Sequence, residues 1–228
     1  MIELLPVEGL PEVRPGDVVA DLIADRAELR DGDVVVVTQK VVSKAEGRLA
    51  PVSSEGERRR LVEQESVRVL RRRADLFISE TAHGFVCANA GVDLSNVETG
   101  WAALLPIDPD LSARRIRDRL RARAGVEVGV VVSDTFGRPW RNGLVDVAIG
   151  CAGVAAVADL RGLPDAQGRP MEVTEIAVAD QVASAAELAM GKASGIPAVV
   201  VRGLDPAWLR ESSIRAEVVR PYDEDLFR

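Results

Sequence analysis

The segment 128–143, VGVVVSDTFGRPWRNG, joins a run of apolar residues to a dense group of polar ones. Val128–Val132 is mostly β-branched, which predicts a buried strand. After it come Asp134 and two guanidinium groups, Arg138 and Arg141, whose charge suits an anionic substrate. α/β proteins often place ligand sites where a core strand ends, because the strand fixes the loop that carries the chemistry. The sequence therefore predicts a site centred on Asp134, with a simple strand-end cap as the alternative.

Lysine is rare in this chain, so its positions are informative. Lys40 and Lys44 follow the buried strand predicted at Val34–Val37, and Lys192 stands in the segment MGKASGIP. Compact ammonium charges suit phosphate oxygens, which predicts phosphate binding by Lys40 and Lys44. Solvated lysines on a loop are the equally weighted alternative. MGKASGIP is not a Walker loop, because two alanines stand where that pattern requires glycine and a hydroxyl residue.

A second polar stretch, FISETAHGFVCANAGVDLSN at 77–96, contains further candidates. Asp93 and Asn96 lie in a glycine-containing loop, where short polar side chains can reach a hard cation or a ribose. His83 and Cys87 stand four apart, a spacing that would bring a thiol nucleophile to its base only on a helix. The glycine and the β-like residues between them disfavour a helix, so the sequence disfavours a catalytic Cys–His pair.

Composition limits what kind of protein this chain can form. With 228 residues, 47% of them apolar, it can bury a real core. We expect one unit over residues 1–228, built as two closely joined lobes at most. No apolar run approaches the ~18 residues of a membrane span, and the start lacks a signal-peptide pattern. We therefore expect a cytoplasmic protein that does not contact a membrane.

Charge and metal-ligand counts exclude two further classes. A net charge of −7 argues against nucleic acid as a partner. Two cysteines without a CxxC pair and a single histidine cannot build a zinc cage and give no sign of a disulfide framework.

Hydrophobic periodicity places helices and strands around these sites. Helices are predicted at 17–29, at 57–73 with Val69 and Leu70 facing inward, at 112–124 with Ser112 as its cap, and from Asp180 to Ala189. Strands are predicted at 34–37, 77–78, 85–87, 128–132, 172–178 and 198–202, with polar loops at 38–44 and 133–143. The segment 145–158 is compatible with either a helix or a strand. The two arginine-rich helices are interpreted as solvated faces.

The polar candidates together fit an octahedral magnesium or manganese site that bridges a nucleotide. Such ions bind few carboxylates and complete their coordination shell with phosphates and water. The residues alone therefore favour a nucleotide-using enzyme. A metal-dependent nucleotide phosphohydrolase and a nucleotide-binding regulatory module would use the same residues.

Seven strings between Leu10 and Leu204 resemble, in unbroken order, the coenzyme F420-0:gamma-glutamyl ligase family. They are TQKVVSKAEGR, ETAHGFVCANAGVDLSNV, LSARRIRDRLR, VVSDTFGRPWRNG, VDVAIGCAG, VTEIAVADQVASAAELAMG and GIPAVVVRGL. In some members of that family a nitroreductase-like domain follows the ligase unit. This chain stops at RPYDEDLFR, which fits either a stand-alone ligase or the N-terminal ligase half of the longer form, and the resemblance implies ligase chemistry alone.

The resemblance implies GTP-dependent addition of L-glutamate to the carboxylate of coenzyme F420-0, giving GDP and phosphate. Further glutamates would be joined through their gamma-carboxyls. The GTP γ-phosphoryl group would form an acyl phosphate that the glutamate amine attacks. The implied fold is a two-lobed mixed α/β (α+β) unit with mixed sheets, paired as an intertwined homodimer with the site near the interface.

The resemblance also implies roles for particular residues. Asp93, Asp134 and Thr135 match ligands of two divalent cations, Mg²⁺ or Mn²⁺, and a potassium ion is implied beside them. The positions that match guanine-nucleotide contacts are Leu10, Pro11, Glu12, Val13, Gln39, Lys40, Lys44, Asn96, Met190, Gly191 and Lys192. Asp93, Asp134 and, from its charge, Arg138 are expected to be catalytic. Many members have glutamine at the position of Lys192, which leaves the contact there open.

Overall fold

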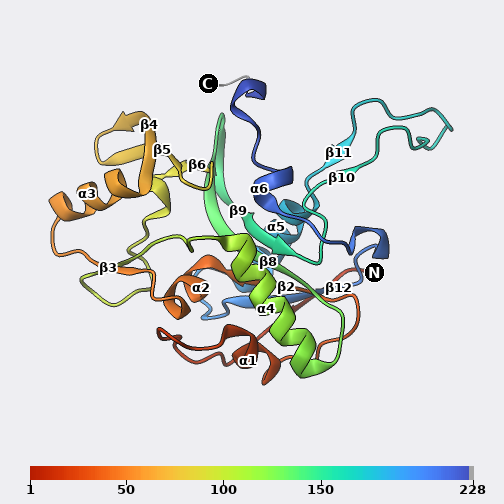
Figure 1. Cartoon of the computed structure of the whole chain (residues 1–228), viewed down its shortest axis with the longest axis horizontal. Coiled ribbons are helices and arrows are strands. Elements are labelled where there is room, and N and C mark those ends of the chain that lie inside the picture. The colour runs from red at the N-terminus through yellow and green to blue at the C-terminus, as the bar shows by residue number, and fades with distance from the viewer. Residues whose placement is uncertain (226–228) are drawn as a thin grey trace.

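The computed structural model describes residues 1–225 and is organised around one five-stranded mixed sheet (Figure 1). Its strands, in spatial order, are β1 (Glu3–Pro6), β12 (Ala198–Arg202), β2 (Val34–Thr38), β8 (Gly129–Arg138) and β9 (Arg141–Ala152). Within this sheet β2 and β8 pair in parallel, and the other neighbours pair antiparallel. The predicted mixed α/β class with mixed sheets is confirmed.

Helices and shorter strands surround this sheet. The helices are α1 (Val19–Ala24), α2 (Gln39–Ala45), α3 (Glu55–Glu65), α4 (Pro109–Ala124), α5 (Val178–Met190) and α6 (Ile214–Glu217), with 3₁₀ turns η1 (Asn89–Gly91), η2 (Pro206–Trp208) and η3 (Tyr222–Glu224). The smaller sheets are β4 (Ser66–Arg73) with β5 (Leu76–Thr81) and β6 (Val86–Ala88), β3 (Leu49–Pro51) with β7 (Trp101–Ala103), and β10 (Ala158–Asp159) with β11 (Glu175–Ile176). Among the helices of residues 1–225, none combines the length and apolar character needed to cross a membrane.

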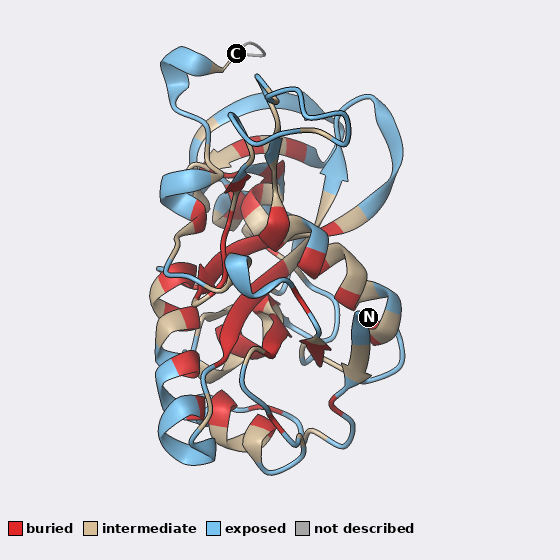
Figure 2. Ribbon diagram, turned by 90° about the vertical axis from the view of Figure 1, so that its right-hand side faces the viewer, coloured by how far each residue is buried: buried red, intermediate tan, exposed pale blue. Residues whose placement is uncertain are grey.

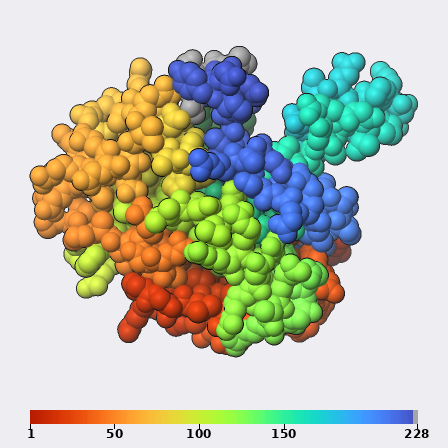
Figure 3. Space-filling view, viewed as in Figure 1, coloured from red at the N-terminus to blue at the C-terminus, as the bar shows by residue number. Residues whose placement is uncertain are grey.

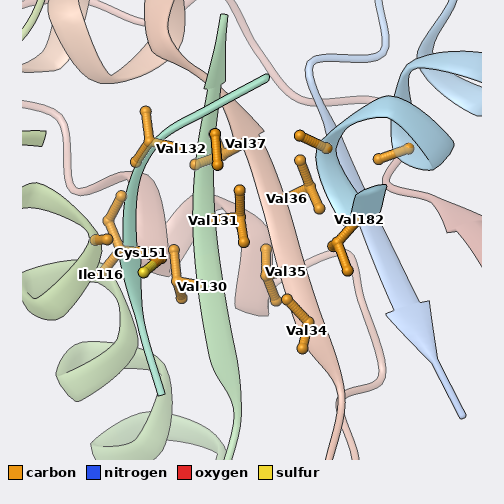
Figure 4. Close-up of a cluster of buried hydrophobic side chains, with 14 of the residues drawn as sticks. Val34, Val35, Val36, Val37, Ile116, Val130, Val131, Val132, Cys151 and Val182 are labelled. Carbon is orange, nitrogen blue, oxygen red and sulfur yellow. The ribbon is translucent and has the colours of Figure 1, made fainter. Parts of the chain in front are cut away.

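The centre of the main sheet is buried on both faces, because its parallel strands are runs of valine. Val34–Val37 of β2 and Val130–Val132 of β8 have no exposed surface. Figure 4 shows Ile116 of α4 and Val182 of α5 on opposite sides of this strand pair. A continuous β-branched run is what a strand covered on both faces requires. The buried residues accordingly concentrate along the middle of the molecule (Figure 2).

Two features lie outside this main core. A second hydrophobic cluster is formed by Val62, Phe77, Val92, Ala102 and Leu104. The segment between β10 and β11 forms an arm that projects from the body (Figure 3). The expected two lobes, single unit and intertwined homodimer stay predictions.

The structure corrects the helix predicted at 57–73. The helix ends at Glu65, and Ser66–Arg73 continues as strand β4, which pairs antiparallel with β5. Val69 and Leu70, predicted to face inward, are 40% and 37% exposed. Pairing with a neighbouring strand has overridden the helical spacing of the apolar residues.

The structure also corrects the loop predicted after Val132. β8 continues to Arg138 and β9 starts at Arg141, so the polar residues lie on a long hairpin, not in a loop. Trp140, with φ of +58°, occupies its tip. The undecided segment 145–158 is strand as far as Ala152.

Smaller corrections concern helix boundaries. The predicted loop 38–44 is mostly α2, and the predicted helix 17–29 shortens to Val19–Ala24. α4 is capped by Asp108 rather than Ser112, because Asp108 accepts a hydrogen bond from the N–H of Leu111. Asp180 lies inside α5 and accepts a hydrogen bond from the N–H of Ala148 in β9 instead of capping. Of the strand predicted at 172–178, only Glu175–Ile176 is formed.

Replacing Gly150 by alanine should destabilise the fold. Gly150 lies in β9 against the start of α4, and a Cβ atom there would come within 2.3 Å of the Pro109 carbonyl. Backbone cannot yield as a side chain does, so we expect a loss of roughly 1–3 kcal/mol in the free energy of unfolding. Gly137→Ala is the matched control, because no atom lies within 4 Å of its Cβ position. Its effect in chemical denaturation should stay within about 0.5 kcal/mol. Equal stability of the two variants would contradict this packing.

Candidate active site

A cavity of about 720 Å³ lies where β2 ends at Thr38, beside Ser133–Thr135 in the middle of β8. Its lining contains every residue predicted from the sequence to hold the nucleotide or the metal: Leu10, Pro11, Glu12, Val13, Gln39, Lys40, Lys44, Asp93, Asn96, Asp134, Thr135, Met190, Gly191 and Lys192. These residues come from segments far apart in the chain. The structure thus brings them together, while their roles stay predictions.

Parallel pairing of β2 with β8 places two of these segments side by side. Thr38 lies opposite Ser133, so α2 begins at Gln39 next to Asp134. The side chain of Gln39 is buried, and its Oε1 accepts a hydrogen bond of 2.8 Å from the Ser43 hydroxyl one turn later. The start of α2 is therefore fixed against the sheet at the edge of the cavity.

Asp93 is positioned by its backbone and by one lysine. Its N–H and C=O exchange hydrogen bonds of 3.0 and 2.8 Å with Ala103. Its Oδ2 lies 2.7 Å from Nζ of Lys40, and its Oδ1 accepts a 2.7 Å hydrogen bond from the N–H of Ser95. Burial acts to raise the pKa of Asp93, but the hydrogen bonds from Lys40 and Ser95 outweigh it and hold this pKa below its usual value.

The carboxyl group of Asp134 has the opposite environment. Removal from water raises the pKa of Asp134 to about 7. The N–H of Thr135 opposes this shift, and the negative charges of Asp93 and Asp146 reinforce it. Cations stabilise such a carboxylate, and Lys40 is the one that lowers the pKa here. Asp134 is thus the carboxyl group in the cavity with most to gain from a further cation.

Lys192 lies among three oxygen-bearing side chains. Its Nζ is 2.7 Å from Oγ1 of Thr135 and 3.2 Å from Oδ1 of Asp146, and it forms an ion pair with Glu187. Burial acts to lower the pKa of Lys192, but Glu187 and Asp146 outweigh it and raise this pKa above its usual value. The ammonium group is therefore held in its charged form.

Asp146 and Glu187 are site residues that the sequence prediction missed. Asp146 stands opposite Thr135 in the β8–β9 hairpin, and Glu187 lies on the last turns of α5. A strand prediction for 145–158 would have paired Asp146 with the polar end of β8. No sequence pattern pointed to Glu187, which reaches the cavity only because α5 packs against β9.

Lys44 forms an ion pair with Glu12, and both residues line the cavity. The Glu12 carboxylate is largely exposed, whereas the Lys44 side chain is mostly buried. Exposed partners of this kind add little stability and exchange readily. The fold thus positions the Lys44 ammonium group, while its ion pair with Glu12 is weak.

The structure does not bring Arg138 and Arg141 to this cavity. The Arg138 guanidinium donates hydrogen bonds to the carbonyls of Asn142 and Gly143 within the hairpin. It lines a second cavity, of about 990 Å³, together with Trp140. Four residues of strand separate Arg138 from Asp134, about 13 Å. A role for Arg138 beside Asp134 has no support from the geometry of a single chain.

The disfavoured Cys–His pair is absent from residues 1–225. The ring nitrogens of His83 contact the carbonyl of Pro106 and the hydroxyl of Thr81 instead of Cys87. Burial raises the pKa of Cys87 to about 12, with the charge of Asp134 adding to the shift. A thiol with this pKa stays protonated and is a poor nucleophile.

The donor groups fit one divalent cation better than two. Within residues 1–225, no three His, Cys, Asp or Glu side chains form a ready-made metal centre. Mg²⁺, however, is commonly held by one or two carboxylates and completed by water and phosphates, which suits Asp93 and Asp134. A further ion at Thr135 is disfavoured, because its hydroxyl already donates to Asp146 and accepts from Lys192, whose positive charge opposes a second cation beside it.

A large cavity at the ends of parallel strands, lined by carboxylates and lysines, is typical of mixed α/β enzymes. The chain belongs to the F420-0:gamma-glutamyl ligase family, whose model matches residues 9–203. The resemblance predicted from the sequence strings is thereby confirmed.

Curated relatives agree with this assignment over their whole length. The chain is 46% identical over 246 residues to the coenzyme F420:L-glutamate ligase of Methanopyrus kandleri, an alignment that covers 100% of this chain and 97% of the relative. It is 43% identical over 249 residues to the coenzyme F420:L-glutamate ligase of Methanothermobacter thermautotrophicus, with 100% and 99% covered. The corresponding protein of Archaeoglobus fulgidus is 43% identical over 244 residues, with 100% and 96% covered.

Replacing Asp134 by asparagine should stabilise the metal-free protein at alkaline pH. The pKa of this carboxyl is about 7 when folded, against a reference value of 3.8, so the folded state binds the proton more tightly than the unfolded state. Ionisation therefore costs stability increasingly between about pH 4 and pH 7. We expect Asp134→Asn to gain about 1–2 kcal/mol at pH 8, a rise of about 3–6 °C in Tm, and almost nothing at pH 4.

Asp93→Asn is the matched control for this thermal denaturation experiment. The pKa of Asp93 is lowered by its partners Lys40 and Ser95, so ionised Asp93 supports the fold. Its replacement should lower the Tm or leave it unchanged at pH 8. An equal rise in Tm for both variants, or no rise for Asp134→Asn, would contradict the opposite electrostatic environments of Asp93 and Asp134.

Proposed function

We propose that this chain is a GTP-dependent ligase that joins the amino group of L-glutamate to the carboxylate of coenzyme F420-0 and releases GDP and phosphate. Further glutamates would be added through their gamma-carboxyls. The relatives' names give coenzyme F420 and L-glutamate, and the family description gives the F420-0 form of the acceptor. One observation carries the nucleotide part: the residues matched to guanine-nucleotide contacts line the same cavity as Asp93 and Asp134.

The proposed reaction solves the problem that a carboxylate does not react with an amine. A carboxylate oxygen of the acceptor takes the γ-phosphoryl group of GTP, and the bond from that phosphorus to the bridging oxygen of GDP breaks. The product is an acyl phosphate. The glutamate amine then attacks its carbonyl carbon, phosphate leaves with the bonding electrons, and the amine loses a proton as the amide forms.

Lys40 and Lys44 are the residues best placed to bind the phosphates. Both lie on α2 and line the cavity, and each is now paired with a carboxylate that phosphate could replace. A cavity of about 720 Å³ is of the size that commonly encloses one organic ligand. A divalent cation at Asp93 and Asp134, Mg²⁺ or Mn²⁺, would offset the negative charges of the γ-phosphoryl group and the acceptor carboxylate as they meet.

We further propose that the chain acts in the cytoplasm as a two-lobed, intertwined homodimer. Trp140 and Leu144 on the β8–β9 hairpin are 81% and 66% exposed, and a partner chain would cover such large apolar side chains. Leu144 also lines the cavity, which places this exposed surface next to the site. A dimer mass in light scattering at micromolar concentration supports this proposal, and a monomer mass contradicts it.

Phosphate release from GTP tests the proposed activity directly. Release that requires both coenzyme F420-0 and L-glutamate is expected, together with a product heavier by one glutamyl residue. Asp134→Asn should abolish release while keeping a native circular dichroism spectrum, because it removes one of the two carboxylates proposed to hold the divalent cation. Release without acceptor would identify a phosphohydrolase instead. No release under any condition would leave only nucleotide binding.

Lys40→Met and Lys44→Met should each weaken binding of a non-hydrolysable GTP analogue. Loss of a charge-assisted contact to phosphate is worth about 1.5–3 kcal/mol, so the dissociation constant should rise by about 10- to 150-fold in calorimetry. Arg59→Met is the control, because Arg59 also forms an ion pair, with Asp75, but lies outside the cavity. Unchanged affinity in both lysine variants would show that these side chains do not bind phosphate.

A further inference from the structure

The Lys192 ammonium group contacts three oxygen atoms, as a bound cation would. Its Nζ contacts Oγ1 of Thr135 at 2.7 Å, Oδ1 of Asp146 at 3.2 Å and a carboxylate oxygen of Glu187. An ammonium group has three N–H donors and no acceptor. The three oxygens therefore use all of its donors, and Lys192 is held in place instead of pointing freely into the cavity.

The groups around Lys192 form a closed network. Asp146 also accepts hydrogen bonds from the hydroxyls of Ser133 at 3.1 Å and Thr135 at 2.6 Å. Glu187 accepts a further hydrogen bond of 2.8 Å from the N–H of Asp146. The Asp146 side chain is only 4% exposed, and a carboxylate so deeply buried requires a nearby positive charge. Lys192 supplies that charge.

The neighbouring carboxylates, Asp93 and Asp134, are not balanced by positive charge in this way. Asp93 has Lys40 and Ser95 as partners, whereas Asp134 lines the same cavity as two other carboxylates, Asp93 and Asp146, whose negative charges act on it. One lysine at this pair leaves an excess of negative charge, which a divalent cation would balance. The cavity thus contains one group of oxygens already occupied by a built-in cation and one that is open to a metal ion.

We propose that the Lys192 ammonium occupies the place of a second divalent cation, so that this protein binds one divalent cation, at Asp93 and Asp134, and uses Lys192 as a fixed positive charge beside it. The two divalent cations that the resemblance implies do not fit the residues of this chain. The inference rests on the proposed function only for the first cation and the nucleotide. Thr135, Asp146 and Glu187 hold the lysine and take no metal while it is present.

Counting bound Mn²⁺ tests this inference without measuring activity. Equilibrium dialysis with saturating GDP should give one Mn²⁺ per wild-type chain, with the resolved spectrum of an isolated Mn²⁺ ion in electron paramagnetic resonance. Lys192→Gln removes the charge, frees Asp146 and Glu187, and offers a carboxamide oxygen of similar reach. We expect two Mn²⁺ per chain in this variant, with the broadened spectrum of ions about 3.5–4 Å apart.

Lys192→Arg is the matched control, because it keeps the positive charge and should bind one Mn²⁺. The Lys192 side chain is 59% exposed, so both variants should fold, which circular dichroism checks. Two ions in the wild-type protein, or one in Lys192→Gln, would overturn the inference and leave the proposed ligase function intact. No Mn²⁺ in the wild-type protein with GDP would instead contradict the proposed cation at Asp93 and Asp134.

Discussion

The parallel pairing of β2 with β8 is the constraint on which the candidate site depends. Thr38 opposite Ser133 fixes the start of α2 beside Asp134, so two segments that are far apart in the chain open at the same edge of the sheet. This pairing is possible because α4 and α5 cover the valine runs on both faces. A shift of one residue in this pairing would move the start of α2 along β8 and so change the position of its lysines relative to Asp134.

Charge explains why this cavity suits an anion only together with a cation. Its charged lining consists of the carboxylates Glu12, Asp93, Asp134, Asp146 and Glu187 and the lysines Lys40, Lys44 and Lys192. Carboxylates exceed ammonium groups, so a triphosphate alone would meet net repulsion. The raised pKa of Asp134 is the local sign of the same imbalance. Nucleotide and divalent cation must therefore bind as partners in the proposed reaction.

The sequence predicts the parts of the site that lie next to clear signals. Asp134 and Lys40 follow valine runs, and the fold class comes from the same runs. The β8–β9 hairpin was not predicted, because Pro139, Gly143 and the charged residues around them are equally typical of a loop. Pairing with the next strand across a short turn decides both this segment and the end of α3 at Glu65, and the residue types alone do not show it. The role of Glu187 in the site could not be predicted either, because Glu187 reaches the cavity only through long-range packing of α5 against β9.

The position of Lys192 follows from the way α5 is attached to the hairpin. The Ser184 hydroxyl donates a hydrogen bond to the carbonyl of Asp146, and the N–H of Asp146 donates one to the Glu187 carboxylate. α5 is therefore attached to the hairpin at Asp146, the residue that forms an ion pair with Lys192. Gly191 ends the helix with φ of +61°, a conformation that suits glycine, and so turns Lys192 back toward Thr135. α5 thus supplies one carboxylate partner of the lysine and the anchor of the other, and the turn that ends α5 supplies the lysine itself. A cation fixed by backbone geometry in this way is present at every metal concentration, whereas a bound ion is not.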